Sequence, residues 1–194
     1  MTRSGIVTSA LLATAVCVIL LPGCRKVELD ENSRARLAVV PDDRNVLASV
    51  TCDREPRVPP LDGGRVLGRT GNTVLVDAPR SVYRELDEMD GLVRVVVWGE
   101  GAVAGRMDPL LRTQLLEQVD QGHLSEPISV IATFREDSAD VEGRLKTAGA
   151  VPRTVAGRVV TLDAGFNAVM TVLTFEDLLT LTRPRQLRML GDGS

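Results

Sequence analysis

The chain has 194 residues, of which 23 are Lys or Arg and 26 are Asp or Glu, so its net charge is −3. This mildly acidic balance argues against a nucleic-acid-binding protein, which needs a basic surface. The aromatic content of 3% is too low for a sugar-binding or base-stacking platform built from rings. Apolar residues are sufficient for a packed core in one domain or in two small ones.

The N-terminus has the pattern of an export signal. Arg3 is the only charged residue among residues 1–23, and residues 6–21 are predominantly apolar. This apolar stretch is shorter than the ~20 residues that span a bilayer core. A short basic region, an apolar segment and small residues therefore predict a secretory signal peptide over residues 1–23. The alternatives are an uncleaved membrane anchor, or an ordinary signal peptide followed by a coincidental cysteine.

The sequence Leu21-Pro22-Gly23-Cys24 resembles the lipobox of bacterial lipoprotein precursors, although Pro22 departs from the usual Ala, Ser or Thr. The resemblance implies cleavage between Gly23 and Cys24 and attachment of fatty acids such as palmitate to Cys24. Two or three acyl chains would hold the chain stably on a membrane. Arg25 occupies a position where lipoproteins of the inner membrane often carry Asp, so the expected location is the bacterial cell envelope, on the outer rather than the inner membrane.

The cysteines leave one free thiol in the mature chain. Cys17 is lost with the signal peptide and Cys24 carries lipid, so Cys52 has no intrachain partner. Cys52 ends an apolar, strand-like run, where we expect it to be a small buried side chain. The alternative is an intermolecular disulfide or a redox site.

After Cys24 the chain begins with polar residues and then becomes mixed. Residues 24–38 are predicted to be a polar tether, and residues 39–104 to form a degenerate α+β unit. Proline and glycine exclude a helix from residues 53–70. The expected elements of this unit are strands 46–52, 73–76 and 92–98, and a helix from Pro79 through Met89.

A glycine-rich break, Gly99, Gly101 and Gly105, predicts a flexible boundary between two halves. The second half then covers residues 105–194. It opens with a helix over residues 107–121, because Asp108 can cap it, Pro109 suits its first turn and Gly122 can end it. Leu111, Leu115 and Val119 fall on one face of this helix, with Leu116 beside them.

The second half contains the element order β-α-β-β-α-β. A strand is expected over 128–134, a helix from Asp137 or Ser138 through Ala148, a strand over 155–162 that can be split at Gly157, a helix over 167–174 and a strand over 178–181. This order predicts the α+β class with a ferredoxin-like domain.

Two segments match at an offset of 86 residues. Gly71 aligns with Gly157, Asp77 with Asp163 and Leu92 with Leu178. Because these identities coincide with predicted element boundaries, we interpret the first half as a degenerate copy of the second. The alternative is that any two strand–helix–strand units share such a pattern.

The runs Ile128–Phe134, Leu145–Ala150 and Val155–Val160 resemble the propeptide and inhibitor domains of subtilisin-type proteases. This resemblance covers residues 107–190 and implies protease inhibition or folding assistance. It also implies a C-terminal tail that enters a protease active site, and Arg183, Pro184, Arg185 and Leu187 are the candidate residues of that tail. The chain departs from the pattern because no protease domain follows and the first half lacks the first helix.

No residue set predicts catalysis. His123 is the only histidine, so neither a histidine pair for a metal nor a catalytic triad can be assembled around it. The acidic pairs Glu136-Asp137 and Glu176-Asp177 are typical of solvated turns, and dinucleotide, phosphate-loop and nucleophile-elbow motifs are absent from the sequence.

We therefore expect a non-enzymatic lipoprotein without metal or cofactor, which binds another envelope or secreted protein. The alternatives are a structural or assembly lipoprotein of the envelope, and an enzyme with an unrecognised site.

Overall fold

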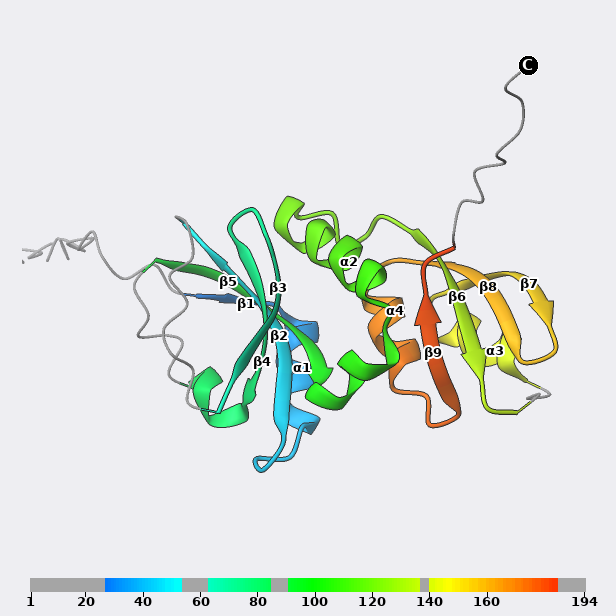
Figure 1. Cartoon of the computed structure of the whole chain (residues 1–194), viewed down its shortest axis with the longest axis horizontal. Helices are drawn as coiled ribbons and strands as arrows, with labels where there is room; N and C mark the ends of the chain where they lie inside the picture. The colour runs from blue at the N-terminus through cyan, green and yellow to red at the C-terminus, as the bar shows by residue number, and fades with distance from the viewer. Residues whose placement is uncertain (1–26, 54–62, 85–90, 137–139, 185–194) are drawn as a thin grey trace, which may run out of the picture.

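The computed structural model describes residues 27–53, 63–84, 91–136 and 140–184, and these form an α+β protein with two sheets (Figure 1). The first sheet has the strand order β1-β5-β2-β4-β3 and the second has the order β7-β8-β6-β9. Helix α2 lies between the two sheets in the view of Figure 1. No helix within the described residues is long and apolar enough to span a membrane.

The elements of the first half are β1 (Glu28–Leu29), α1 (Glu31–Val39), β2 (Asn45–Cys52), β3 (Arg65–Thr70), β4 (Thr73–Pro79), η1 (Arg80–Arg84), β5 (Leu92–Glu100) and η3 (Gly101–Arg106), where η denotes a 3-10 helix. The elements of the second half are α2 (Pro109–Gln121), β6 (Ile128–Phe134), α3 (Val141–Thr147), β7 (Val151–Ala156), β8 (Val159–Ala164), α4 (Phe166–Leu173) and β9 (Leu178–Thr182).

The predicted signals of helix α2 are confirmed. The Asp108 carboxylate accepts a hydrogen bond from the backbone N–H of Leu110 at 2.8 Å. Pro109 occupies the first turn, and Gly122 ends the helix in the left-handed conformation, with φ of 78°. The predicted apolar face is buried, with Leu111 and Leu115 fully inaccessible to water.

Residues 28–38 are not the polar tether that their composition predicts. They form β1 and most of α1, which packs against β5. Asp30 caps this helix, and the fully buried Ser33 hydroxyl accepts a hydrogen bond from the backbone N–H of Val97 at 2.9 Å. Arg36 donates to the Val97 carbonyl at 3.0 Å. The polar side chains thus bind the sheet backbone instead of water, which composition alone does not reveal.

Other elements differ from the prediction in extent. Residues 65–70 lie in the stretch from which the sequence excluded a helix, and they form strand β3. The single strand expected over 155–162 is instead part of a hairpin of β7 and β8, which turns at Gly157 with φ of 57°. The helix expected over 79–89 begins as the 3-10 helix η1, and residues 85–90 lie outside the described part. The expected glycine linker forms the end of β5 and the 3-10 helix η3, whose Val103 and Ala104 are buried in the core.

The main apolar core contains side chains from both sheets. Trp98 from β5 meets Phe166 from α4 edge to face, with ring centroids 5.4 Å apart. The Trp98 indole donates a hydrogen bond to the buried Ser49 hydroxyl at 3.0 Å. A smaller core lies between α1 and the opposite face of the first sheet, around Val46, Ala48 and Val97.

The two sheets share a pairing pattern. Strands β3-β4-β2-β5 follow the same antiparallel order as β7-β8-β6-β9. Both hairpins, β3–β4 and β7–β8, contain a register shift, at Val66/Gly68 and at Pro152/Thr154. The β2–β5 and β6–β9 pairings share a shift as well, at Thr51/Cys52 and at Thr133/Phe134. A further shift of the β2–β5 pairing, at Leu47/Ala48, has no counterpart in the β6–β9 pairing.

Replacing Ser49 with alanine is expected to destabilise the protein by about 1–3 kcal/mol, because the Trp98 indole N–H would lose its buried acceptor. Urea unfolding measures this change, and the fluorescence of Trp98, the only tryptophan, should shift with it. Ser125→Ala, at an exposed position, is the control and should leave both signals unchanged. An equally stable Ser49→Ala variant would contradict the role given to this hydrogen bond.

Candidate protein-docking surface

The second sheet has one covered face and one open face. Helices α3 and α4 lie on the covered face, where Val130, Ala132, Phe134, Val160 and Leu162 are fully buried. Side chains alternate between the faces of a strand, so the intervening residues point to the opposite side. Those residues are all exposed or half-buried, and no described element covers them.

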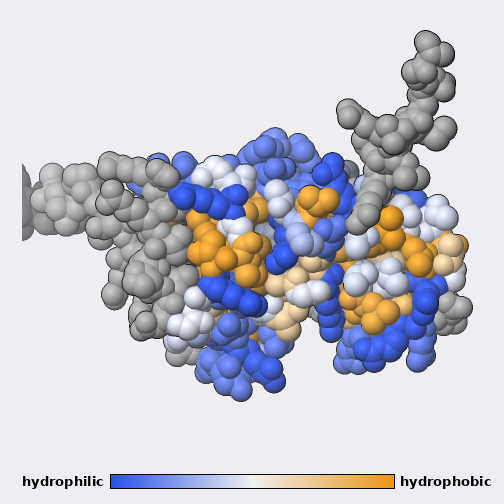
Figure 2. Space-filling view, viewed as in Figure 1, coloured by the Kyte–Doolittle hydropathy of each residue, from blue (hydrophilic) through white to orange (hydrophobic). Residues whose placement is uncertain are grey.

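The strand register arranges this open face in three rows. Residues paired across neighbouring strands share a face and lie about 4.5–5.5 Å apart. The rows are Val151–Asp163–Ser129, then Thr154–Thr161–Ile131–Thr182, then Ala156–Val159–Thr133–Thr180. Figure 2 shows the region over β6, β8 and β9 as a mixture of hydrophobic orange and near-neutral pale atoms.

The charges on the open face are paired at one end. The Ser129 hydroxyl donates a hydrogen bond to the Asp163 carboxylate at 2.6 Å, and the Nε atom of Arg153 donates a second one at 2.7 Å. These two hydrogen bonds hold the pKa of Asp163 below its usual value. The rest of the face consists of hydroxyl and aliphatic side chains. Such a low content of charged residues is typical of the centre of a protein interface.

The corresponding face of the first sheet is covered by α2. Leu47, Leu75 and Val96 share one core cluster with the apolar face of this helix. The C-terminal turn of α2 is also fixed by polar contacts, because Asp120 accepts hydrogen bonds from the Thr73 hydroxyl at 2.8 Å and from the backbone N–H of Asn72 at 3.2 Å. Two structurally matched faces therefore differ in whether a helix lies on them.

The sheet edges differ in accessibility. At β9, the backbone N–H of Asp108 donates to the Leu181 carbonyl at 3.0 Å, so the start of α2 occupies part of that edge. At β7, Val151 and Val155 are 53% and 50% exposed. Pro152 and the register shift beside it interrupt the hydrogen-bonding row of β7, which disfavours addition of a long strand there.

The predicted tail is only partly within the described residues. Arg183 is exposed and Pro184 is half-buried directly after β9, whereas Arg185 and Leu187 lie outside the described part. Gly23 and Cys24 also lie outside it.

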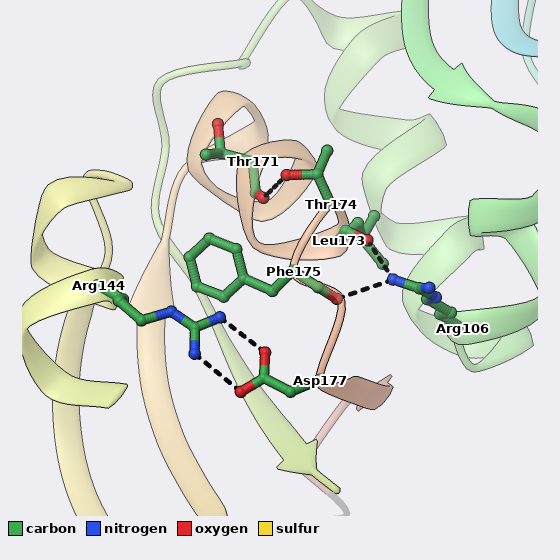
Figure 3. Close-up of polar contacts among 7 residues, drawn as sticks. All are labelled: Arg106, Arg144, Thr171, Leu173, Thr174, Phe175 and Asp177. Atoms are coloured by element: carbon green, nitrogen blue, oxygen red, sulfur yellow. Dashed lines mark hydrogen bonds and ion pairs between the residues drawn. The ribbon is translucent and has the colours of Figure 1, made fainter. Parts of the chain in front are cut away.

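The most organised polar cluster joins α3 to the turn between α4 and β9 (Figure 3). Arg144 forms two hydrogen bonds with the Asp177 carboxylate, at 2.7 and 2.8 Å, and its guanidinium lies 4.4 Å from the centre of the Phe175 ring. On the other side of this turn, Arg106 donates to the carbonyls of Leu173 and Phe175, both at 2.9 Å. The cluster thus holds the turn in place, and its carboxylate, that of Asp177, is paired with Arg144.

A groove of about 360 Å³ lies between α1, the end of β5, η3 and α4. Its lining includes the apolar Trp98, Val103 and Met170 and two arginines, Arg36 and Arg106. Both guanidinium groups donate to main-chain carbonyls, so the groove presents apolar walls and arginines that already serve the fold.

The remaining candidate residues are not brought together. His123 is half-exposed, and its Nδ1 lies 3.4 Å from the Glu126 carboxylate. Cys52 is a half-buried free thiol that packs beside the smaller core, and burial raises its pKa. Within the described residues, no group of three or more His, Cys, Asp or Glu side chains is placed to hold a metal ion.

Sequence reasoning did not identify the open face. The signal for it is the alternation within residues 128–134, where Ser129 and Thr133 separate apolar residues. That alternation indicates two different faces, but it does not tell whether another element covers the second one.

The comparisons with known proteins give no match: no protein-family model fits the chain, and no curated protein or solved structure is significantly similar to it.

Asp177→Asn is expected to lower stability at neutral pH by about 0.5–1 kcal/mol, a modest value because both partners are partly exposed. Arg144 lowers the pKa of Asp177 below 3.8. The ion pair therefore stabilises the folded chain above that pH, and this contribution is lost as the pH falls through the lowered pKa.

Urea unfolding at pH 7 and near pH 3 should show the difference between wild type and Asp177→Asn shrinking in acid. The neighbouring exposed Glu176 supplies a control, Glu176→Gln, for which no such convergence is expected. A pH-independent difference for Asp177→Asn would contradict the ion-pair assignment.

Proposed function

We propose that this chain is a lipid-anchored, non-enzymatic protein-binding module of the bacterial cell envelope, and that it binds through the open face of its second sheet. The observation that carries the proposal is the uncovered face of β6, β7, β8 and β9, whose counterpart in the first sheet is covered by α2. An uncovered sheet face that is poor in free charge and rich in threonine suits reversible contact with another protein.

We also infer that the two halves are duplicated ferredoxin-like units. The shared strand order and the matched register shifts support this inference. At the offset of 86 residues, β3 corresponds to the whole of β7, and the turns of both hairpins contain a glycine with positive φ, Gly71 and Gly157. Unrelated sheets have no reason to share bulge positions, since each bulge is a local insertion in one strand.

The anchor is proposed from the lipobox-like sequence that ends at Cys24. Acylation there would place the folded part close to the membrane surface, because α1 begins at Glu31. The proposed location is the outer membrane, because the residue directly after the acylated cysteine is Arg25 and not the Asp that inner-membrane lipoproteins often carry there. The partner is then another envelope protein or a secreted protein.

Inhibition of a subtilisin-type protease is the most specific version of this proposal, and it rests on the resemblance of residues 107–190 to propeptide domains. A soluble chain that begins after Cys24 should then slow such a protease at micromolar concentration. Deletion of residues 183–194 should abolish that effect. Absence of inhibition across a panel of such proteases would remove this version and leave the general proposal of protein binding.

Cys24→Ser is expected to release the protein from membranes and to abolish labelling by a fatty-acid probe, because serine offers no thiol for the lipid. Fractionation of cells, followed by detection of the protein in membrane and soluble fractions, measures this change. Cys52→Ser is the matched control, since it removes the other thiol of the mature chain and should leave both the labelling and the fractionation unchanged. Continued membrane association of the Cys24→Ser variant would contradict the anchor.

A photo-crosslinking amino acid at Ile131, in the middle of the open face, is expected to give a defined adduct with another protein in living cells. The same amino acid at Glu142, exposed on α3 at the other side of the sheet, is the control and should give little or none. Mass spectrometry identifies the partner, and a permanent envelope component would favour an assembly role. Equal adducts from both positions, or none from either, would contradict binding through the open face.

A further inference from the structure

We infer that the groove between α1, the end of β5, η3 and α4 binds a small organic carboxylate with an apolar chain, of about the size of a ten-carbon fatty acid. This site is separate from the open face of the second sheet and does not depend on the proposed function. Two features carry the inference. They are a pair of arginines without acidic partners and exposed apolar groups beside them.

The two guanidinium groups that line the groove have only neutral acceptors. Arg36 donates through Nη1 to the Val97 carbonyl at 3.0 Å and through Nη2 to the side-chain oxygen of Asn167 at 2.7 Å. Arg106 uses only Nη1, which donates to two main-chain carbonyls at 2.9 Å. Among the residues that the structure describes, no carboxylate forms an ion pair with either arginine.

These cations are therefore incompletely compensated. Both side chains belong to half-buried residues, and burial lowers the pKa of Arg36 despite the opposing field of Asp30. Charges that are removed from water are normally paired. The Nε and Nη2 atoms of Arg106 donate to no atom of the described residues, and this pair of donors matches the two oxygens of a carboxylate.

The position of Arg106 favours a carboxylate over a phosphate. Its guanidinium bonds to the Leu173 carbonyl in the last turn of α4 (Figure 3). The C-terminal end of a helix carries partial negative charge. A phosphate group, with a charge near −2 and three acceptor oxygens, is better suited to a helix N-terminus with its free N–H groups. A singly charged anion meets less repulsion in this groove.

The exposed apolar groups of the groove fit an alkyl chain. Val39, at the end of α1, is 80% exposed, and Ala102 in η3 is exposed as well. The buried Trp98 and Met170 also line the groove. An alkyl chain laid between α1 and η3 would remove the exposed apolar groups from water, which is favourable.

The volume of the groove sets the length of the chain. It is about 360 Å³, which corresponds to about 12 non-hydrogen atoms if each occupies ~30 Å³, as a water molecule does. Decanoate, with ten carbons and two oxygens, has this size.

The test titrates decanoate into the chain from residue 24 onward, which contains every described residue and carries Cys24→Ser so that no attached lipid competes. Calorimetry in detergent-free buffer gives the stoichiometry and the Kd. One molecule per chain is expected, with decanol at least about tenfold weaker because it lacks the charge. Decyl phosphate should also be weaker, and decyltrimethylammonium, of opposite charge, should show no saturable binding.

Trp98 reports whether the ligand lies in this groove, because it is the only tryptophan and is part of the lining. Bromine quenches indole fluorescence only at close range. Decanoate brominated at carbon 6 or carbon 10 should therefore quench Trp98 with the same concentration dependence as the calorimetric binding. Saturable binding without quenching by either compound would place the ligand elsewhere and overturn the assignment.

A charge series at Ala102 supplies the matched variants. Ala102→Glu should raise the Kd of decanoate at least about fivefold, because the chain then supplies its own carboxylate, whereas Ala102→Lys should not raise it. The two substitutions add side chains of similar length at an exposed position, so urea unfolding should show similar stability for both. Ala156→Glu, at an exposed position on β7, is the control and should leave the Kd unchanged.

The outcomes are independent of the open face. Absence of saturable decanoate binding, equal affinity for decanol, tighter binding of decyl phosphate, or a Kd that is indifferent to the sign of the charge at position 102 would overturn this site. None of these results affects protein binding through the second sheet, which crosslinking at Ile131 tests.

Discussion

Helix α2 satisfies the most demanding constraint in this molecule, which is the need to cover the apolar face of the first sheet. Leu47, Leu75 and Val96 cannot remain in water without cost, and the apolar stripe of α2 removes them from it. The start of the same helix bonds to β9 of the second sheet through the backbone of Asp108. One helix therefore completes the first unit and joins it to the second.

The contact between the two sheets depends on a small number of large side chains. Trp98 and Phe166 are two of the very few aromatic residues in the chain, and they meet at this contact. Arg36 lies over the same Phe166 ring, 5.8 Å from its centre, and so connects α1 to α4. Two of the few aromatic rings in this chain therefore lie at the contact between its two halves.

The sequence was most informative where local chemistry decides structure. Strand 128–134 and helix α2 could be predicted because their apolar periodicity and end signals, from Asp108 to Gly122, act within a few residues. Helix α1 could not, since its polar residues Ser33 and Arg36 find partners in β5, far along the chain. The candidate docking face was also hidden, because alternation along a strand shows that two faces exist and only the tertiary structure shows which is covered.

The matched register shifts have a consequence for solubility. In β6 and β8 the side chains of the covered face are all apolar, whereas the open face carries Ser129, Thr133, Thr161 and Asp163 beside Ile131 and Val159. A slip by one position would exchange the two sets. Phe134 and Leu162 would then lie in water and Thr133 and Thr161 would be buried. The bulges at Pro152/Thr154 and Thr133/Phe134 fix one alignment at both edges of this sheet. A slipped sheet would expose its apolar residues, so these irregularities protect the protein from aggregation.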